Sequence, residues 1–189
     1  MNEALTGAEK FDFVILQEQS ILPVHEKSYA FYYAVRALTE KIRSSGAQPI
    51  LYATWGRKDG SDTLEEYKFT HESMTWGLAA AYETIGKELN IPVAHVGLAF
   101  YDVNTNHGNI ELYNKDKSHP SPAGSYLAAT VLFEKIFNVK LSDAKFSGDI
   151  GKDTASILCH AAESAVFNTP EIPEEYIKAS TEASQNTVS

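Results

Sequence analysis

The hydrophobic pattern of the chain predicts three strands. Short apolar runs dense in β-branched and aromatic residues lie at 11–16 (FDFVIL), 49–54 (PILYAT) and 93–96 (VAHV). Runs of this length and composition are typical of strands that are covered on both faces of a sheet. Turn-forming residues such as Gly56 and Gly60 follow the second run and mark its end.

Helical periodicity fills the segments between and after these strands. Apolar side chains recur there every three or four residues, which places them on one face of a helix. This pattern predicts helices over residues 26–45, from 62 to 89, from Ser121 onward and over 153–167. The polar stretch at 102–109 is predicted to be irregular.

This order of elements favours a layered α/β domain with a parallel sheet, because strands that alternate with helices are joined by right-handed crossovers. We expect one domain over residues 1–168 and a flexible tail over 169–189, which is rich in Pro, Glu, Ser and Thr. Most sheets have about four to six strands. With three, the strand at 11–16 is expected to have an open edge, so that either an upstream segment is missing or a second molecule covers it.

Composition and charge indicate which kinds of molecule the chain is not expected to bind. The chain has 189 residues, of which 43% are hydrophobic and 22% charged, and its formal net charge is -9 at pH 7. An acidic surface repels nucleic-acid phosphates and anionic membranes, so neither is an expected partner. The single cysteine, Cys159, excludes a disulfide within the chain. With no apolar leader in residues 1–10, we expect a cytoplasmic location for the chain as written.

A candidate catalytic pair lies just before the helix that starts at Ser121. Asp116 and His119 are three residues apart in a polar loop. The carboxylate can therefore accept the Nδ1 proton of the imidazole and leave Nε2 as a base. Pro120 and Pro122 stiffen this turn. On spacing alone, an ordinary surface or capping pair is the more frequent outcome, and that alternative stays open.

Other candidates follow the predicted strands, because ligands of open parallel sheets collect beyond the carboxyl ends of the strands. Gln17, Gln19 and Ser20 come directly after the first strand, and Trp55 comes directly after the second. We expect Trp55 and Trp76 to be core residues rather than ligand platforms, with Trp55 the better pocket candidate because it follows a strand end. The other histidines show no ligand-like spacing, so neither a metal nor a cofactor is expected.

The segment DKSHPSPAGSYLAA, residues 116–129, resembles the last catalytic block of the SGNH, or GDSL-like, hydrolases. In that family, an Asp-x-x-His-Pro turn carries the acid and the base of a Ser-His-Asp triad. Further segments at 11–20, 49–58 and 96–100 look like a bacterial branch of the same superfamily, and the resemblance covers most of residues 11–137. It implies a flavodoxin-like α/β/α fold and ester hydrolysis, with a small-molecule or carbohydrate ester as substrate.

The resemblance also implies a role for each candidate. His119 corresponds to the base of the triad and Asp116 to the residue that orients it. Gln19 stands at about the position of the family's oxyanion-hole Asn, and its amide NH₂ could still donate a hydrogen bond. Gln17 falls near the preceding glycine position of the family and is the weaker match.

The family's nucleophile is the feature that this sequence does not show. In the family it lies on a Gly-Asp-Ser or Gly-Asn-Ser turn after a strand that precedes the segment matching residues 11–16. We therefore expect Met1 to be an internal start, the activity to be impaired, and a secreted parent protein to be an alternative location. Ser20, Ser118 and Ser121 are weak substitutes, since Ser20 lacks flanking glycines and Ser121 is better explained as a helix N-cap.

Two functions without catalysis remain open. The first is a binding or assembly module, including a homo-oligomer, that pairs through the open edge of the strand at 11–16. The second is a carbohydrate-binding protein that uses Trp55, Tyr101 and the polar residues 104–109.

Overall fold

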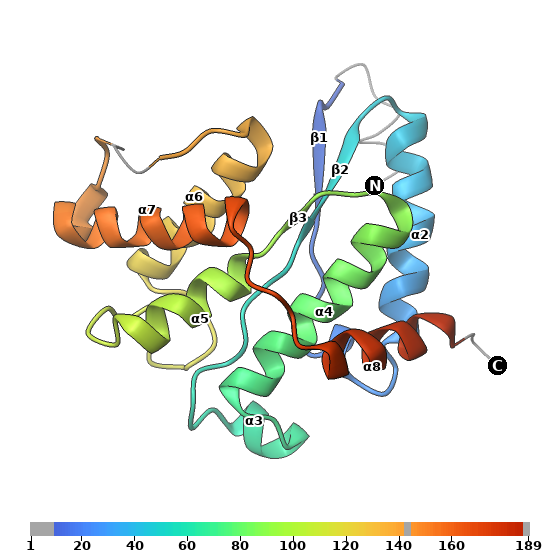
Figure 1. The fold of residues 1–189 in the computed structure, drawn as a ribbon, viewed down its shortest axis with the longest axis horizontal. Helices are drawn as coiled ribbons and strands as arrows, with labels where there is room; N and C mark the ends of the chain where they lie inside the picture. Colours follow the sequence, from blue (N-terminus) through green and yellow to red (C-terminus); the bar gives the residue numbers. More distant parts are fainter. Residues whose placement is uncertain (1–9, 142–144, 187–189) are drawn as a thin grey trace.

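The computed structural model describes residues 10–141 and 145–186 of the chain (Figure 1). Its centre is a parallel sheet with the strand order β1-β2-β3, formed by β1 (Phe13–Leu16), β2 (Gln48–Tyr52) and β3 (Val93–Ala94). In the register of this sheet, Phe13 is paired with Gln48, and Leu51 is paired with Val93. The predicted strands and their parallel arrangement are confirmed.

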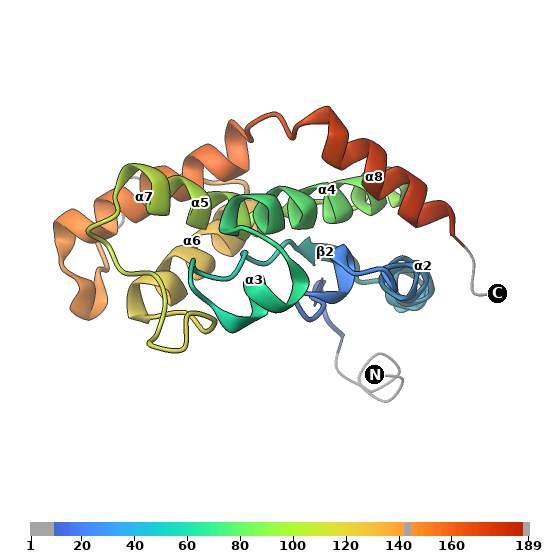
Figure 2. The same cartoon turned by 90° about the horizontal axis from the view of Figure 1, so that it is seen from below.

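Helices cover the sheet in a three-layer α/β/α arrangement, as predicted. Seen from below, α4 and α8 lie on one side of β2, with α8 outside α4 (Figure 2). The helices are η1 (Leu22–Val24), α2 (Tyr29–Ser44), α3 (Asp62–Tyr67), α4 (His71–Leu89), α5 (Val96–Asn106), α6 (Pro122–Phe137), η2 (Gly148–Ile150), α7 (Lys152–Phe167) and α8 (Glu174–Gln185).

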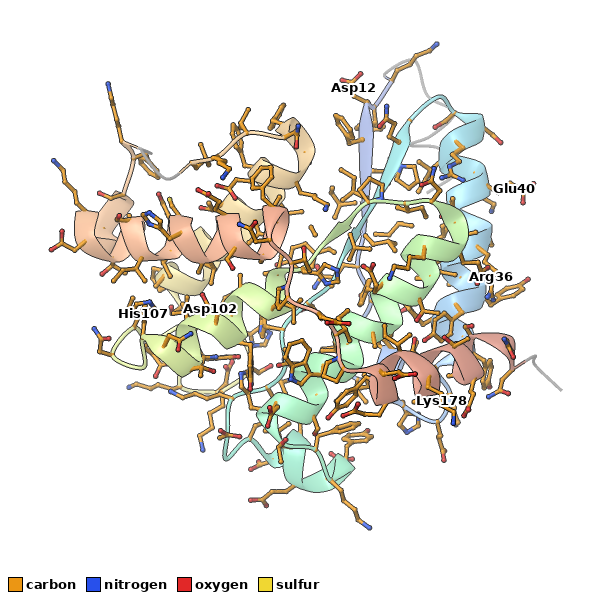
Figure 3. All side chains as sticks on the ribbon, viewed as in Figure 1. Asp12, Arg36, Glu40, Asp102, His107 and Lys178 are labelled. Atoms are coloured by element: carbon orange, nitrogen blue, oxygen red, sulfur yellow. The ribbon has the colours of Figure 1, made fainter. Side chains whose placement is uncertain are left out.

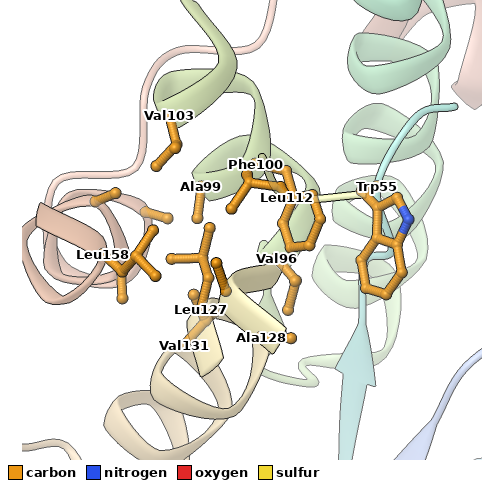
Figure 4. Close-up of a cluster of buried hydrophobic side chains, with 14 of the residues drawn as sticks. Trp55, Val96, Ala99, Phe100, Val103, Leu112, Leu127, Ala128, Val131 and Leu158 are labelled. Atoms are coloured by element: carbon orange, nitrogen blue, oxygen red, sulfur yellow. The ribbon is translucent and has the colours of Figure 1, made fainter. Parts of the chain in front are cut away.

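Two hydrophobic cores lie on the two faces of β2, because successive side chains of a strand point to opposite faces. Leu51 belongs to a core formed with α2 and α4, where Ile42 and Leu78 are fully buried. Ile50 belongs to the other core, formed with α5, α6 and α7 (Figure 4). Cys159 of α7 is buried beside this second core.

The prediction of a single helix from 62 to 89 is wrong, because this segment forms two helices, α3 and α4. The backbone of Lys68 is left-handed (φ 57°), which ends α3. A new start follows at once, because the Thr70 side chain accepts the backbone N–H of Ser73 (3.0 Å) while the Ser73 hydroxyl bonds the backbone N–H of Thr70 (2.9 Å). This capping box begins α4 in a new direction.

The stretch predicted as strand end and irregular polar loop, residues 96–109, is mostly the helix α5. Only Val93 and Ala94 remain in β3. The buried residues Val96, Ala99 and Val103 are spaced by three and four, which is the period of a helix. This spacing places all three side chains in the second core. The expectation of an irregular loop is therefore wrong up to Asn106.

The expectation of a flexible tail is wrong for residues 174–185, which form α8 and pack against α4. The contact includes a buried hydroxyl beside apolar side chains such as Ala183. Ser180 Oγ lies 2.7 Å from Thr84 Oγ1, 2.9 Å from Tyr32 Oη and 3.1 Å from the carbonyl oxygen of Ala80. Residues 187–189 of the predicted tail lie outside the described residues.

Within residues 10–141 and 145–186, one edge of the first strand is unpaired, as expected from the strand count. Among the described residues, β1 pairs with β2 alone. Its alternate side chains Phe13 and Ile15 are 36% and 38% exposed, and the preceding Phe11 is 48% exposed. Across the described residues, no helix combines the length and the apolar character that crossing a membrane requires.

Candidate active site

Asp116 and His119 lie in the loop of residues 113–121, here called the His119 loop, which connects α5 to α6. Oδ2 of Asp116 is 2.7 Å from Nδ1 of His119. Oδ1 of the same carboxylate accepts the backbone N–H groups of Ser118 (3.0 Å) and His119 (2.9 Å). The hydrogen bond from His119, followed by these backbone bonds, lowers the pKa of the Asp116 carboxyl to about 2. The predicted contact is present, and the carboxylate is ionised at ordinary pH.

Local hydrogen bonds give the His119 loop its shape. Tyr113 and Pro120 form an antiparallel bridge, and the backbone N–H of Asn114 donates to the carbonyl of His119 (2.8 Å). Lys117 has a left-handed backbone (φ 59°), and its N–H donates to the carbonyl of Asn114 (3.0 Å). This tight return brings Asp116 and His119 onto one exposed tip.

The imidazole of His119 is open to solvent. Its side chain is 75% exposed and that of Asp116 is 50% exposed. With the proton of the neutral ring on Nδ1 and facing the carboxylate, Nε2 carries the lone pair. No hydrogen bond joins Nε2 to a serine hydroxyl within residues 10–141 and 145–186. The ring is therefore placed to act as a base toward a molecule that approaches from outside.

The serines that the sequence offered as substitutes are engaged or buried. Ser20 is 7% exposed, and its Oγ has no hydrogen-bond partner among the residues that the structure describes. Ser121 is the N-cap of α6, as predicted: its Oγ accepts the N–H of Gly124 (3.1 Å) and donates to the carbonyl of Glu111 (2.7 Å). The Ser118 hydroxyl accepts a hydrogen bond from Arg57.

Trp55 lies beneath the His119 loop. It belongs to residues 53–61, here called the β2 loop, which follows β2. Its indole Nε1 donates to the carbonyl of Ser118 (3.0 Å), and its ring stacks on Phe100 of α5 with 4.5 Å between centroids and 7° between planes (Figure 4). Because Trp55 is only 9% exposed, the structure places it as a support of the loop. Its predicted contact with substrate stays a prediction.

Gln17 and Gln19 lie at the carboxyl end of β1, on the same edge of the parallel sheet as the β2 loop. The Oε1 atom of Gln19 accepts the backbone N–H groups of Ile21 (2.9 Å) and Leu22 (3.2 Å). Only the amide oxygen can accept these protons, so the NH₂ of Gln19 points away from the turn as an available donor. Gln17 is exposed. In the described part of the chain, no hydrogen bond joins either glutamine to the His119 loop.

Sequence reasoning missed the contacts by which the β2 loop holds the His119 loop. The guanidinium of Arg57 donates to Ser118, and the backbone N–H of Lys58 donates to the carbonyl of Lys117 (3.0 Å). The ammonium of Lys117 returns to the carbonyl of Gly60 (2.6 Å). The sequence did offer one signal: Arg57 and Lys58 follow the second predicted strand, so they lie at the carboxyl edge of the sheet.

The other polar candidates lie apart from this pair. Asp102 and His107 lie toward the C-terminal end of α5, at the outer side of the molecule (Figure 3). Asn104 turns inward, with Nδ2 3.3 Å from Nε2 of His71 and 3.4 Å from the hydroxyl of Tyr113. Within the described ranges, no group of three or more His, Cys, Asp or Glu side chains could hold a metal ion.

Solved structures of known proteins are similar to this chain in fold. No family model and no curated protein matches the chain. Among solved structures, the chain is similar to a protein from Slackia heliotrinireducens that is assigned to the SGNH hydrolases. The two are 35% identical, with a TM-score of 0.63, over 71% of this chain and 70% of that chain.

A second solved structure is similar in fold. It is a DUF4886 family protein from Bacteroides uniformis, with a TM-score of 0.77 and 20% identity over 92% of this chain and 68% of that chain. The similarity of both structures to this chain agrees with its layered α/β fold. The similarity to the first shows the family: the chain belongs to the SGNH hydrolases, as the segment at 116–129 indicated.

Proposed function

We propose that the chain carries the acid–base pair of an SGNH-type ester hydrolase, with His119 as the base and Asp116 as the residue that orients it. The observation that carries the proposal is the 2.7 Å contact between Asp116 Oδ2 and His119 Nδ1, next to an Nε2 that faces solvent. An imidazole held in this way takes the proton of an attacking hydroxyl and later gives it to the leaving alcohol. The substrate class is a small-molecule or carbohydrate ester.

Gln19 is proposed as the donor that stabilises the oxyanion. The turn at Ile21 and Leu22 fixes its amide oxygen and leaves the NH₂ group unused among the described residues. A donor that is already oriented needs little reorganisation when charge develops on the substrate oxygen. Its location at the carboxyl end of β1 supports this role, because that edge of the sheet also carries the β2 loop under His119.

The proposal includes an impaired rate for this 189-residue chain. The hydroxyls of Ser118 and Ser121 are bonded elsewhere, and Ser20 is buried. A triad that works without its nucleophile keeps only the residual catalysis of its remaining parts. We therefore propose slow hydrolysis, in which His119 activates water directly.

The test is hydrolysis of p-nitrophenyl acetate by the chain and three variants. We expect a slow rate that is proportional to substrate concentration, and a decrease of about ten-fold in His119→Ala. This is below the usual 10²- to 10⁴-fold range of general base catalysis because no hydroxyl nucleophile takes part. Asp116→Asn should fall nearly as far. His160→Ala is the matched control, since His160 is exposed on α7 and bonds the carbonyl of its own helix at Ser156.

Each outcome of this assay decides a part of the proposal. Equal rates for the unaltered chain and His119→Ala would show that His119 is not a base for ester hydrolysis. Saturable kinetics that His119→Ala abolishes would show that the chain supplies its own nucleophile, and the proposal of an impaired rate would then be wrong. A loss of rate in His160→Ala as large as that in His119→Ala would show that any exposed histidine of the chain hydrolyses the ester, and that His119 has no special role.

A second candidate function is assembly through β1. The observation that favours it is the open edge of this strand together with the exposed side chains of Phe13 and Ile15. An unpaired strand offers a row of backbone N–H and C=O groups to a strand of another molecule. We propose a second copy of the chain as the partner in this case.

Ile15→Lys is expected to convert such a dimer into a monomer, because a charge at this position would be buried without a partner in the contact. Sedimentation velocity at several concentrations measures the change. Tyr33→Lys is the matched control, since Tyr33 is 69% exposed and lies on α2, outside β1. A chain that is monomeric without any substitution would rule out this candidate.

A further inference from the structure

Ser118 is held from the β2 loop by two side chains. Nε1 of Trp55 donates to the carbonyl of Ser118 (3.0 Å). Nη1 of Arg57 donates to the same carbonyl (3.4 Å) and also to the Ser118 hydroxyl. Sixty-one and 63 residues of chain separate the partners of these bonds, so the bonds fix one loop against another rather than shaping either loop alone.

The position of Ser118 decides the geometry of the acid–base pair. Ser118 stands between Asp116 and His119 in the chain, and its N–H shares Oδ1 of Asp116 with the N–H of His119. The other oxygen of the carboxylate meets Nδ1 of the ring. A shift of Ser118 therefore changes both the backbone bonds to the carboxylate and the angle at which the carboxylate reaches the imidazole.

The backbone of Arg57 is held in place by residues of α4, so its guanidinium can hold Ser118 in a fixed position. Its carbonyl lies 2.8 Å from Nδ1 of His71, which is 9% exposed at the start of α4. Its backbone N–H points to Sδ of Met74 (3.3 Å), which is fully buried. Beside it, the hydroxyl of Tyr113 donates to the carbonyl of Gly56 (2.8 Å).

The guanidinium of Arg57 is placed at a cost to stability. Nε of Arg57 is buried and has no hydrogen-bond partner among the described residues. Burial lowers the pKa of Arg57, while the nearby charge of Asp116 acts in the opposite direction. A partly buried cation with an unmatched donor is unfavourable for folding. Its contacts with Ser118 give a functional reason for its location.

We propose that Arg57 is a positioning residue for the Asp116–His119 pair: its guanidinium holds Ser118, and through Ser118 it keeps Nδ1 of His119 on the carboxylate of Asp116. The catalytic meaning of this role rests on the proposed function. The contact that it maintains can be measured without any hydrolysis.

Nitrogen-15 NMR of the full chain, labelled at histidine, shows whether Nδ1 of His119 carries a proton and how fast that proton exchanges with water. In Arg57→Met we expect this exchange to be about ten-fold faster, because the hydrogen bonds to Ser118 are lost. Arg57→Lys keeps the charge and a single donor nitrogen in place of the planar guanidinium, so its exchange rate should lie between those of the unaltered chain and Arg57→Met. Arg43→Met is the matched control: the guanidinium of Arg43 also donates two hydrogen bonds, in this case to the carbonyl groups of Leu89 and Asn90, but at the end of α2.

An unchanged exchange rate at His119 in a folded Arg57→Met variant would overturn the inference. Thermal unfolding of the same samples separates positioning from general loosening. If Arg57→Met and Arg43→Met change the His119 signals equally, Arg57 acts only through stability and the inference is wrong. Should Arg57→Met not fold, Arg57→Lys and Ser118→Ala give the same comparison. The ester assay with His119→Ala tests the proposed function separately.

Discussion

Replacing Phe100 by alanine is expected to lower the free energy of unfolding by about 3–5 kcal/mol. Phe100 is fully buried in α5, where its ring stacks on Trp55 and meets the edge of Tyr113 at 5.7 Å between centroids (Figure 4). Truncation removes the transfer free energy of the ring and leaves a cavity between α5 and the β2 loop. Urea unfolding followed by circular dichroism measures the loss.

Phe137→Ala is the matched control for this measurement. Phe137 ends α6, is 58% exposed, and contacts Phe133 at 4.6 Å between ring centroids. Because little of its surface is removed from water on folding, we expect a change of about 0.5 kcal/mol or less. If Phe100→Ala cost no more than Phe137→Ala, the stack under the His119 loop would not be part of the folded core.

Replacing Gly97 by alanine is expected to lower the free energy of unfolding by about 2 kcal/mol. A Cβ atom at this position would lie 2.4 Å from the carbonyl oxygen of Thr54 and 3.2 Å from Cα of Trp55. The N–H of Gly97 donates to the carbonyl of Ala53 (2.9 Å), so α5 cannot move without losing that bond. A clash with backbone costs about 1–3 kcal/mol, and the 2.4 Å contact puts this one at the upper end. The better helix propensity of alanine offsets about 1 kcal/mol, which leaves a loss of about 2 kcal/mol.

Gly108→Ala separates this clash from a general effect of glycine replacement. Its added Cβ would lie 3.6 Å from the carbonyl oxygen of Asn104, which is an ordinary contact. Unfolding of both variants under the same conditions should therefore show a loss in Gly97→Ala alone. Equal stability of the two variants would mean that α5 can withdraw from the β2 loop without cost.

The sequence allowed prediction of the features that depend on near neighbours in the chain. The runs at 11–16 and 49–54 became strands because each is apolar and bounded by turn residues. The contact between Asp116 and His119 needs only a three-residue return, and the cap at Ser121 needs only the next turn of α6. Such features are fixed by spacing and side-chain chemistry.

The features that were missed depend on residues far apart in the chain. The buried face of α8 is built on Ser180, whose polarity indicated a loose tail until Thr84 and Tyr32 supplied its partners. Lys68, which ends α3, has a left-handed backbone, and a lysine in the sequence does not indicate this conformation. The contact of Arg57 with Ser118 crosses 61 residues, and no local pattern encodes it.

The burial of Cys159 makes its thiol a probe of how α7 packs against α6. Its thiol is 1% exposed on α7, with Sγ 3.6 Å from the hydroxyl of Tyr126 on α6, and burial raises its pKa. Because the sequence contains no other cysteine, the rate at which a maleimide attaches to the chain reports how often α7 separates from α6. The labelling rate of Cys159 therefore measures the separation of α7 from α6 without depending on pairing at the open edge of β1.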